Sequence, residues 1–361
     1  MVAHGAAGLL HRADGARREP PGRLAPGEAR PPAPPAVSLL LDVRGLSTHY
    51  VSARGTRVTR AVDQVSFALE EGETLGIVGE SGSGKTTLAL SLLRLLPPAA
   101  RIVAGEVRFE GDDLLRKPAA EMRRIRGKRI AMILQDPMAS LNPLFTIGDQ
   151  VAEPIRIHEG AGRRGAWVRA RELLRAVRIS APELRVREYP HQMSGGMRQR
   201  IVGAIAISCE PRLLIADEPT TSLDVTIQAQ YLNLLRDLQR AHHLAMIFIT
   251  HNLGIVAKMC DRVAVMYAGR MVEGGPIRKI FNAPAHPYTK ALLESIPRLG
   301  DGRARLTAID GQPPDPANPP AGCAFHPRCP RVMDHCRQEA PPELVVGESQ
   351  TARCWLAADR R

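Results

Sequence analysis

The run GESGSGKTT at residues 79–87 constrains the fold of this chain more than any other feature. It follows an apolar segment, LGIV, and precedes a helix-like segment, LALSLLRLL. Gly79, Gly84, Lys85 and Thr86 match the pattern G-x-x-x-x-G-K-[ST], in which backbone N–H groups and a helix start surround phosphate oxygens. The run therefore predicts a strand, a phosphate-binding loop and a helix, in that order.

This pattern also predicts roles for individual side chains of the loop. Lys85 reaches the β- and γ-phosphates of a bound nucleotide, and the Thr86 hydroxyl holds Mg²⁺. The residues expected to surround the nucleotide here are Gly79, Ser81, Gly82, Ser83, Gly84, Lys85, Thr86 and Thr87.

Two carboxylates end a second apolar segment, LLIADEP at residues 213–219. Asp217, at the tip of the predicted strand, suits the coordination shell of Mg²⁺. Glu218 points elsewhere and suits the polarisation of a water for attack on the γ-phosphate. An acidic strand end is common by itself, but beside a phosphate loop it predicts nucleotide hydrolysis.

The rest of the chain alternates between strand-like and helix-like patterns. LLLDVRGLSTHY and TRAVDQVSFALEEGE alternate like strands, whereas residues 144–190 are helical and charged. From Arg212 onward, short apolar strands are separated by helices, which predicts a mainly parallel sheet covered on both faces. We therefore expect an α/β fold of the phosphate-loop nucleoside triphosphatase (P-loop NTPase) type.

Charge and hydropathy limit the classes of partner that we expect for the chain. The formal net charge is +12, but arginines are spread along the whole sequence and aromatic residues make up only 4% of it. Nucleic acid is therefore not an expected partner. No apolar run approaches the roughly 20 residues that span a bilayer, and the N-terminus lacks the apolar core of a secretory signal. We expect a cytosolic protein whose membrane partners, if any, are other chains.

The segment MSGGMRQR at residues 193–200 distinguishes among nucleotide-binding proteins. Ser194, Gly195 and Gly196 open a helix and form a second site suited to anions. A single nucleotide site does not need two phosphate-binding elements in one chain. Two copies of the chain that face each other do need both elements. On these residues the chain resembles the nucleotide-binding subunits of ATP-binding cassette (ABC) transporters. In that family the signature of one subunit closes on ATP held by the phosphate loop of the other.

The resemblance covers residues 39–275 and implies further roles. Tyr50 would stack on adenine, and Gln135 would sense Mg²⁺ and link to a transmembrane partner. His251 would contact the γ-phosphate. The implied reaction is Mg²⁺-dependent ATP hydrolysis, for which the catalytic residues are Lys85, Gln135, Glu218 and His251. The implied Mg²⁺ ligands are Thr86, Gln135 and Asp217.

The resemblance also implies an interface between two such subunits. Gln199 belongs to the signature together with Ser194, Gly195 and Gly196, and this signature acts on ATP bound to the partner. Ser222 and Asp224 lie on the loop that crosses the dimer interface. The fold implied is an ABC ATPase with a mainly parallel sheet, an antiparallel β subdomain, a helical signature subdomain and a cysteine-rich C-terminal extension.

Longer stretches resemble one branch, the oligopeptide, dipeptide and nickel importers of bacteria. These stretches are GETLGIVGESGSGKTT, QDPMASLNP, YPHQMSGGMRQR, DEPTTSLDVTIQAQ and HPYTKALLESIP. Their form resembles the D-type of two paired ATPase subunits. This implies an F-type ATPase as heterodimer partner, two transmembrane permease subunits and an extracytoplasmic substrate-binding protein. The implied location is peripheral, on the cytoplasmic face of the bacterial plasma membrane.

Two alternatives to a peptide importer stay open at this point. The first keeps the ATPase role but changes the cargo to nickel or another small solute, because this branch mixes them. The second is a soluble ABC ATPase that does not serve transport. The second is disfavoured, since no heptads separate Lys85 from Ser194 and the chain carries a single cassette.

Four of the six cysteines lie in the C-terminal tail with the spacing C-x5-C-x6-C-x17-C. They are Cys323, Cys329, Cys336 and Cys354. The tail resembles that of peptide-importer ATPases, which implies a [4Fe–4S] cluster, and four thiolates are a suitable ligand set. Zinc is an alternative, although the C-x2-C pairs usual for zinc are absent, and an unmetallated site is a third. Cys209 and Cys260 are expected to be buried packing residues.

Composition divides the chain into three parts. Residues 1–37 are rich in proline and arginine and are expected to be a disordered tail. Residues 38–275 form the predicted nucleotide-binding domain, with a helical subdomain at about 136–205. Residues 276–361 form the predicted C-terminal extension with the four-cysteine site.

Overall fold

The computed structural model describes residues 39–221, 223–296 and 309–360. The predicted N-terminal tail and Ser222 lie outside the described residues. The strands are β1 Leu39–Val51, β2 Val58–Glu70, β3 Thr74–Val78, β4 Ala100–Phe109, β5 Asp112–Asp113, β6 Ile130–Ile133, β7 Leu213–Asp217, β8 Ala245–Ile249, β9 Arg262–Tyr267, β10 Arg270–Pro276, β11 Leu344–Gly347 and β12 Gln350–Ala352. The α-helices are α1 Lys85–Leu93, α2 Ala119–Ile125, α3 Pro137–Ser140, α4 Ile147–Glu159, α5 Arg163–Ala176, α6 Pro182–Arg185, α7 Gly195–Ile207, α8 Val225–His242, α9 Leu253–Met259, α10 Ile277–Asn282, α11 Pro287–Glu294 and α12 Asp334–Gln338.

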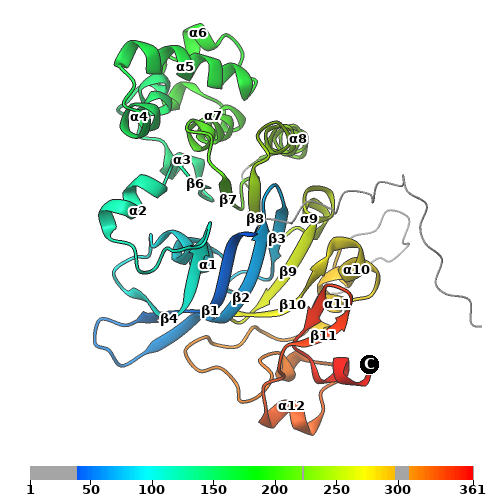
Figure 1. Ribbon diagram of the computed structural model, residues 1–361. Coiled ribbons are helices and arrows are strands. Elements are labelled where there is room, and N and C mark those ends of the chain that lie inside the picture. Colours follow the sequence, from blue (N-terminus) through cyan, green and yellow to red (C-terminus); the bar gives the residue numbers. More distant parts are fainter. Residues whose placement is uncertain (1–38, 222, 297–308, 361) are drawn as a thin grey trace, which may run out of the picture. The chain divides into compact units, whose positions relative to one another are not determined.

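The described strands form two sheets (Figure 1). The smaller sheet has the order β2-β1-β4-β5 and is antiparallel throughout. The larger sheet has the order β11-β12-β10-β9-β3-β8-β7-β6, and its strands from β9 to β6 are parallel. The predicted parallel sheet is therefore present, and its strands β3, β7 and β8 are buried at every residue.

Alternate residues of the central strands supply two separate apolar cores. Ile215 and Ile247 pack with α1 and the antiparallel sheet on one face. Leu214 and Phe248 pack with α8 and the helices of the signature region on the other. Strands buried on both faces need apolar residues at every position, which is why their sequences are runs rather than alternations. Each large buried side chain stabilises the fold by ~1.5–3 kcal/mol.

Helices α4, α5, α6 and α7 form a group of their own beside the strands (Figure 1). Thr146 caps α4 by accepting a hydrogen bond from the Asp149 N–H, at 3.2 Å. The buried face of this group includes Val151, Ala166, Ala170 and Ile201. This part of the chain is helical, as its charged, periodic sequence predicts.

The C-terminal extension continues the larger sheet. Strand β12 pairs antiparallel with β10, and β11 pairs with β12. Glu273 in β10 is 2% exposed. Its carboxylate accepts hydrogen bonds from the N–H groups of Ala285 and His286 and from the Gln350 amide, at 2.7–2.9 Å. A buried charge with three donors thus joins the extension to the sheet.

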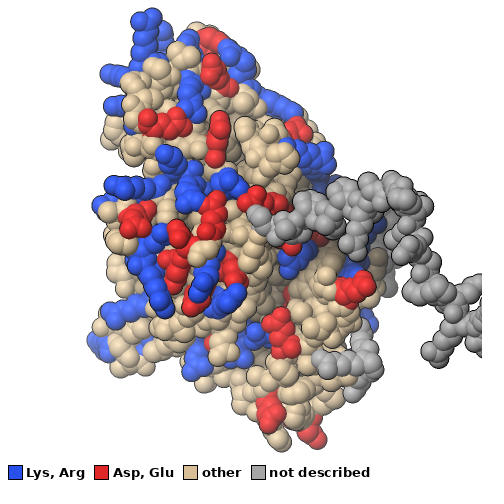
Figure 2. All heavy atoms as spheres, in the orientation of Figure 1, with Lys and Arg blue, Asp and Glu red and all other residues tan. Residues whose placement is uncertain are grey.

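Lysine and arginine are interspersed with aspartate and glutamate on the face shown in Figure 2. On this face the excess of basic residues does not form one continuous patch. No described helix is both long and apolar enough to cross a bilayer.

Candidate functional site

The phosphate loop runs from the end of β3 to the start of α1, as predicted. The Lys85 side chain folds back into this loop and is 6% exposed. Its Nζ donates hydrogen bonds to the carbonyls of Gly79 at 2.8 Å and Glu80 at 2.9 Å. Burial lowers the pKa of Lys85, while the nearby carboxylates of Glu218 and Asp217 oppose that shift. The ammonium therefore lies at the loop, close to both acidic residues.

Two glycines let this loop pass close to neighbouring backbone. A Cβ on Gly84 would lie 2.0 Å from the carbonyl oxygen of Ala61, and the residue has a φ of +104°. A Cβ on Gly79 would lie 2.1 Å from the carbonyl oxygen of Met266. Larger residues do not fit at either position, which explains why the sequence has glycine there.

Asp217 ends β7 and is 1% exposed. Both carboxylate oxygens are buried, and among the described residues neither has a hydrogen-bond partner of standard geometry. Burial raises the pKa of Asp217, and the neighbouring Thr86 hydroxyl lowers it in part. An unpartnered buried carboxylate is costly, so Asp217 and Thr86 fit the binding of a divalent cation.

Three side chains contact the carboxylate of Glu218, and two of them, Gln135 and His251, belong to the predicted site. This carboxylate accepts hydrogen bonds from the Thr221 hydroxyl at 2.9 Å and from the Gln135 amide at 3.4 Å. The His251 Nδ1 lies 3.2 Å from its other oxygen. Residues that follow strands β6, β7 and β8 thus converge, because neighbouring parallel strands end at one edge of the sheet.

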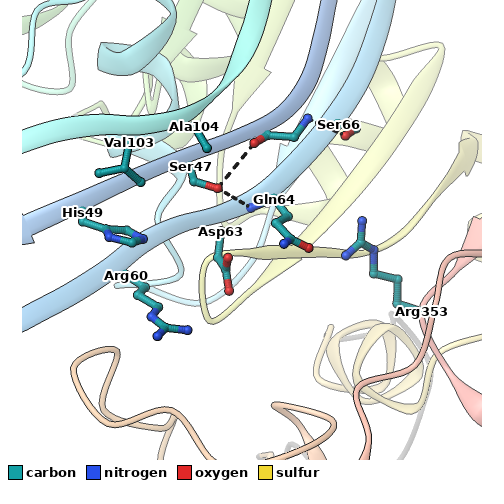
Figure 3. Close-up of a pocket in the computed structure, with 10 residues that line it drawn as sticks. Ser47, His49, Arg60, Asp63, Gln64, Ser66, Val103, Ala104 and Arg353 are labelled. Carbon is teal, nitrogen blue, oxygen red and sulfur yellow. Dashed lines mark hydrogen bonds between the residues drawn. The ribbon is translucent and has the colours of Figure 1, made fainter.

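Tyr50 lies near the phosphate loop, with its hydroxyl 3.4 Å from the Thr87 hydroxyl on α1. The adjacent residue, His49, points to the opposite face of β1, since side chains alternate along a strand. On that face it lines a hollow of about 490 Å³ (Figure 3). In this hollow the Ser47 hydroxyl accepts a hydrogen bond from the Gln64 N–H at 3.0 Å. None of the predicted site residues lines this hollow.

The predicted signature residues occupy the exposed start of α7. Ser194 caps the helix by accepting a hydrogen bond from the Met197 N–H, at 3.3 Å. Ser194 and Gly195 are exposed. A Cβ on Gly196 would meet the Ile227 side chain at 2.7 Å. Among the described residues, no hydrogen bond joins this helix start to the phosphate loop.

Two other residues predicted for the interface are Asp224, which is exposed, and Gln199, which is buried. Asp224 caps α8 by accepting hydrogen bonds from the N–H groups of Thr226 and Ile227, at 3.1 and 3.0 Å. Gln199 is 1% exposed and faces Tyr231, so it is separated from the exposed part of the signature. Side-chain periodicity explains this, because residues five apart on a helix lie on different faces.

The four cysteines of the tail line one small cavity together. The cavity holds about 10 Å³, close to the space of one water. Burial raises the pKa of the Cys323 and Cys329 thiols, and that of Cys354 to about 11. Across the described residues, no three histidine, cysteine, aspartate or glutamate side chains are grouped as a metal site. The four thiols suit a metal cluster as a donor set, but their present arrangement does not have the geometry of one.

Residues that sequence reasoning left out also reach the phosphate loop. The Tyr288 hydroxyl accepts a hydrogen bond from the Glu80 N–H at 2.9 Å. The Arg328 guanidinium forms two hydrogen bonds with the Glu80 carboxylate, at 2.7 and 3.0 Å. Tyr288 and Arg328 lie in the C-terminal extension, far from Glu80 in sequence, so no local pattern indicates these contacts.

Two known families match parts of this chain. Residues 62–221 match the family described as ABC transporter, and residues 272–336 match the family described as oligopeptide/dipeptide transporter, C-terminal region. The second match includes Tyr288 and Arg328.

Comparison with individual proteins gives the same result. A probable peptide ABC transporter ATP-binding protein of Sinorhizobium fredii is 51% identical over 89% of this chain and 96% of its own length. The dipeptide transport ATP-binding protein DppD of Bacillus subtilis is 49% identical, again over 89% of this chain and 96% of its own.

A solved structure has the same fold. It is the dimer of an ATP-binding cassette in a post-hydrolysis state, bound to ADP and phosphate. The superposition has a TM-score of 0.60 at 25% identity and covers 66% of this chain and 99% of that one. With the relatives and the site geometry, it shows that the chain is an ATPase that belongs to the ATP-binding subunits of ABC transporters, in the oligopeptide/dipeptide branch.

Proposed function

We propose that this protein hydrolyses ATP to power a bacterial importer of dipeptides or oligopeptides. The observation that carries the ATPase role is the convergence of Gln135 and His251 on Glu218, beside the buried carboxylate of Asp217. The names of the relatives favour peptides over nickel or another small solute as cargo. A non-transport ABC ATPase is disfavoured by the match of the tail to a transporter C-terminal region.

In this proposal the residues at the sheet edge have distinct roles. Lys85 leaves the carbonyls that it contacts in the described structure and binds the β- and γ-phosphates. Glu218 orients the attacking water, and His251 contacts the γ-phosphate. Thr86, Gln135 and Asp217 would hold Mg²⁺, which would neutralise phosphate charge when bound.

ATP itself lies along the phosphate loop. The adenine stacks on Tyr50, whose hydroxyl already lies near α1. The phosphates lie against the loop residues, which are Gly79, Ser81, Gly82, Ser83, Gly84, Lys85, Thr86 and Thr87. The support for this placement is that Gly79 and Gly84 pack directly against the backbone of Met266 and Ala61, where a side chain would not fit, in a loop of the kind whose N–H groups bind phosphate.

The proposed output is closure and reopening of a dimer. Ser194, Gly195 and Gly196 of each subunit close on the ATP of the other, and Ser222 and Asp224 lie at the interface. Exposure of Ser194 and Gly195 supports this role. Gln199 is buried, so it would stabilise the signature helix and would not contact the nucleotide, which modifies its predicted role.

The proposed partners follow from the peptide-importer assignment. They are a related F-type ATPase in a heterodimer, two transmembrane permease subunits and an extracytoplasmic substrate-binding protein. The chain would then lie on the cytoplasmic face of the plasma membrane, and no nucleic acid takes part. We also propose that the chain divides into a tail at 1–37, a nucleotide-binding domain at 38–275 with a helical subdomain at about 136–205, and an extension at 276–361.

Purification from membranes tests these partners. A tagged full-length chain, extracted in mild detergent, is expected to recover two membrane subunits and a second, different ATPase in equal amounts. Recovery of a stable homodimer with full ATPase activity and no membrane subunit would contradict the importer assignment.

We propose further that the four tail cysteines bind a [4Fe–4S] cluster, with zinc as the alternative. The support is that Cys323, Cys329, Cys336 and Cys354 line one cavity and that four thiolates are a suitable ligand set. Iron and acid-labile sulfide are measured in protein purified without oxygen. Four iron atoms per chain are expected, whereas zinc without iron would rule out the cluster.

A further inference from the structure

Glu80, the second residue of the phosphate loop, is held at three separate points. Its carbonyl accepts a hydrogen bond from Lys85 Nζ at 2.9 Å. Its N–H donates to the Tyr288 hydroxyl at 2.9 Å. Its carboxylate receives both terminal nitrogens of Arg328, at 2.7 and 3.0 Å. Two of the three contacts come from the C-terminal extension, so the extension fixes the backbone and the side chain of this loop residue.

Arg328 is itself firmly placed. Its side chain is 4% exposed. Its Nε donates to the Asp310 carbonyl at 2.9 Å, and a terminal nitrogen donates to the Ile309 carbonyl at 3.3 Å. The guanidinium carbon also lies 5.9 Å from the ring centre of Tyr267 and 6.0 Å from that of Phe325. The Arg328 guanidinium therefore has one orientation, toward Glu80, because it is buried and is held by two carbonyls and two aromatic rings.

Tyr288 is equally constrained. It is 0% exposed, and its ring packs against Tyr267 and Phe325 with centre-to-centre distances of 4.5 and 5.3 Å. Its N–H donates to the Nδ1 of His286 at 3.0 Å. The hydroxyl therefore has little freedom, and it is presented to the Glu80 N–H by the packed rings.

These contacts matter because Glu80 adjoins atoms that must rearrange when ATP binds. Lys85 Nζ is held by the carbonyls of Gly79 and Glu80 in the described structure. When the ammonium turns to phosphate oxygens, these two carbonyls lose their donor. A loop residue anchored from behind by Arg328 and Tyr288 keeps its shape through that change, so the loop is preorganised for the nucleotide.

We propose that Arg328 and Tyr288 are positioning residues of the ATP site, and that the C-terminal extension sets the conformation of the phosphate loop through Glu80. The inference rests on the binding of ATP by the phosphate loop. It assigns the extension a direct part in nucleotide affinity, whatever the cysteine cavity holds.

The test uses the full-length chain and MgATP titrated at equilibrium. Arg328→Gln is expected to weaken ATP binding on the order of tenfold, because the loop must then be ordered by the nucleotide itself. Arg328→Lys restores the charge but not the two-pronged contact, so it is expected to recover only part of the affinity.

Tyr288→Phe provides a second variant in case Arg328→Gln does not fold. It removes only the hydroxyl that accepts from Glu80 and keeps the packed ring. We expect it to weaken ATP binding about threefold, a smaller loss than for Arg328 because one neutral hydrogen bond is involved.

The matched control is the exposed pair of Arg57 and Asp315, which also joins the extension to the cassette but does not contact the loop. Arg57→Gln is expected to bind ATP like the wild type. In steady-state hydrolysis, Arg328→Gln is expected to raise KM for ATP while kcat stays within about twofold, a split that general loss of fold does not produce.

Three results would overturn the proposal. Wild-type affinity in folded Arg328→Gln or in Tyr288→Phe is the first. An equal loss of affinity in Arg57→Gln is the second. A fall in kcat with unchanged KM is the third. If the wild-type chain failed to bind ATP in the same titration, both this proposal and the ATPase assignment would be wrong, which separates that outcome from the other three.

Discussion

Glu218 has a backbone conformation that few residues adopt, with a φ of +45°. Its N–H donates to the Ile249 carbonyl at 2.9 Å, so the neighbouring strand β8 holds the peptide in place. A non-glycine residue in this region costs on the order of 1 kcal/mol. That cost is consistent with a functional position, because the Glu218 carboxylate in this conformation contacts Gln135 and His251.

The first prediction concerns this carboxylate. Glu218→Gln keeps the shape and the hydrogen-bonding capacity of the side chain but removes the negative charge that orients water. We expect MgATP binding within about twofold of wild type and hydrolysis at least about 100-fold slower. Both are measured on the same preparation, by titration and by phosphate release. Glu121→Gln, on an exposed turn of α2, is the control and is expected to be unchanged. Near wild-type hydrolysis in Glu218→Gln would refute the assigned role.

The second prediction concerns His286, which is 1% exposed. Its Nδ1 accepts a hydrogen bond from the Tyr288 N–H, and its Nε2 is buried without a partner among the described residues. Burial lowers the pKa of His286 from 6.5 to about 4. Between these values the unfolded chain binds a proton that the folded chain does not, so stability falls as the pH falls.

The expected loss is about 3 kcal/mol of unfolding free energy between pH 6.5 and pH 4 from this one residue. His286→Asn keeps a side-chain acceptor at the helix start but does not titrate. Chemical denaturation across this pH range is therefore expected to show a shallower decline in the variant than in the wild type. Parallel pH profiles for the two proteins would contradict the burial of a neutral imidazole.

At the scale of elements, the strands of the parallel sheet were predictable because their sequences are wholly apolar. The end of α1 was predicted less well. Its apolar sequence suggests a helix to about Leu96, but the helix ends at Leu93 and Arg94 takes a left-handed φ of +53°. Pro97 and Pro98 follow and cannot continue a helix.

The edge strands β11 and β12 were not predicted at all. Their short sequences lack a strong alternation, and the buried hydrogen bond between Gln350 of β12 and Glu273 of β10 joins residues that are 77 positions apart. Contacts over such separations are set by tertiary packing rather than by local propensity. The same reason explains why sequence reasoning found the phosphate loop but not its anchors in the extension.

The third prediction tests that edge. Gln350→Ala removes one of the three donors to the buried Glu273 carboxylate. We expect the free energy of unfolding to fall by about 1–3 kcal/mol. Gln338→Ala, at an exposed position of α12, serves as the control and is expected to change stability by less than about 0.5 kcal/mol. Equal stability of the two variants in urea would show that Gln350 is not needed at this edge.

At the scale of the whole molecule, the structure is a cassette whose C-terminal extension contacts both the large sheet and the phosphate loop. The extension continues the large sheet through β12 and contacts the phosphate loop through Arg328, which is 248 residues from Glu80 in sequence. The resemblance to ABC ATPases, carried by the sequence motifs, implied the cassette and the residues Gln135 and His251 that come together with Glu218. The burial of Gln199 was not predicted, because the packing of α7 against Tyr231 of α8 decides which face of the helix is buried.

ATP hydrolysis by this chain is proposed to drive peptide import. The decisive measurement is the ATPase rate of the complete transporter in lipid vesicles, with and without binding protein loaded with a dipeptide or oligopeptide. We expect that loaded binding protein raises the rate several-fold, that peptide accumulates inside the vesicles, and that Glu218→Gln abolishes both. An ATPase rate that is indifferent to peptide, with no accumulation, would contradict it.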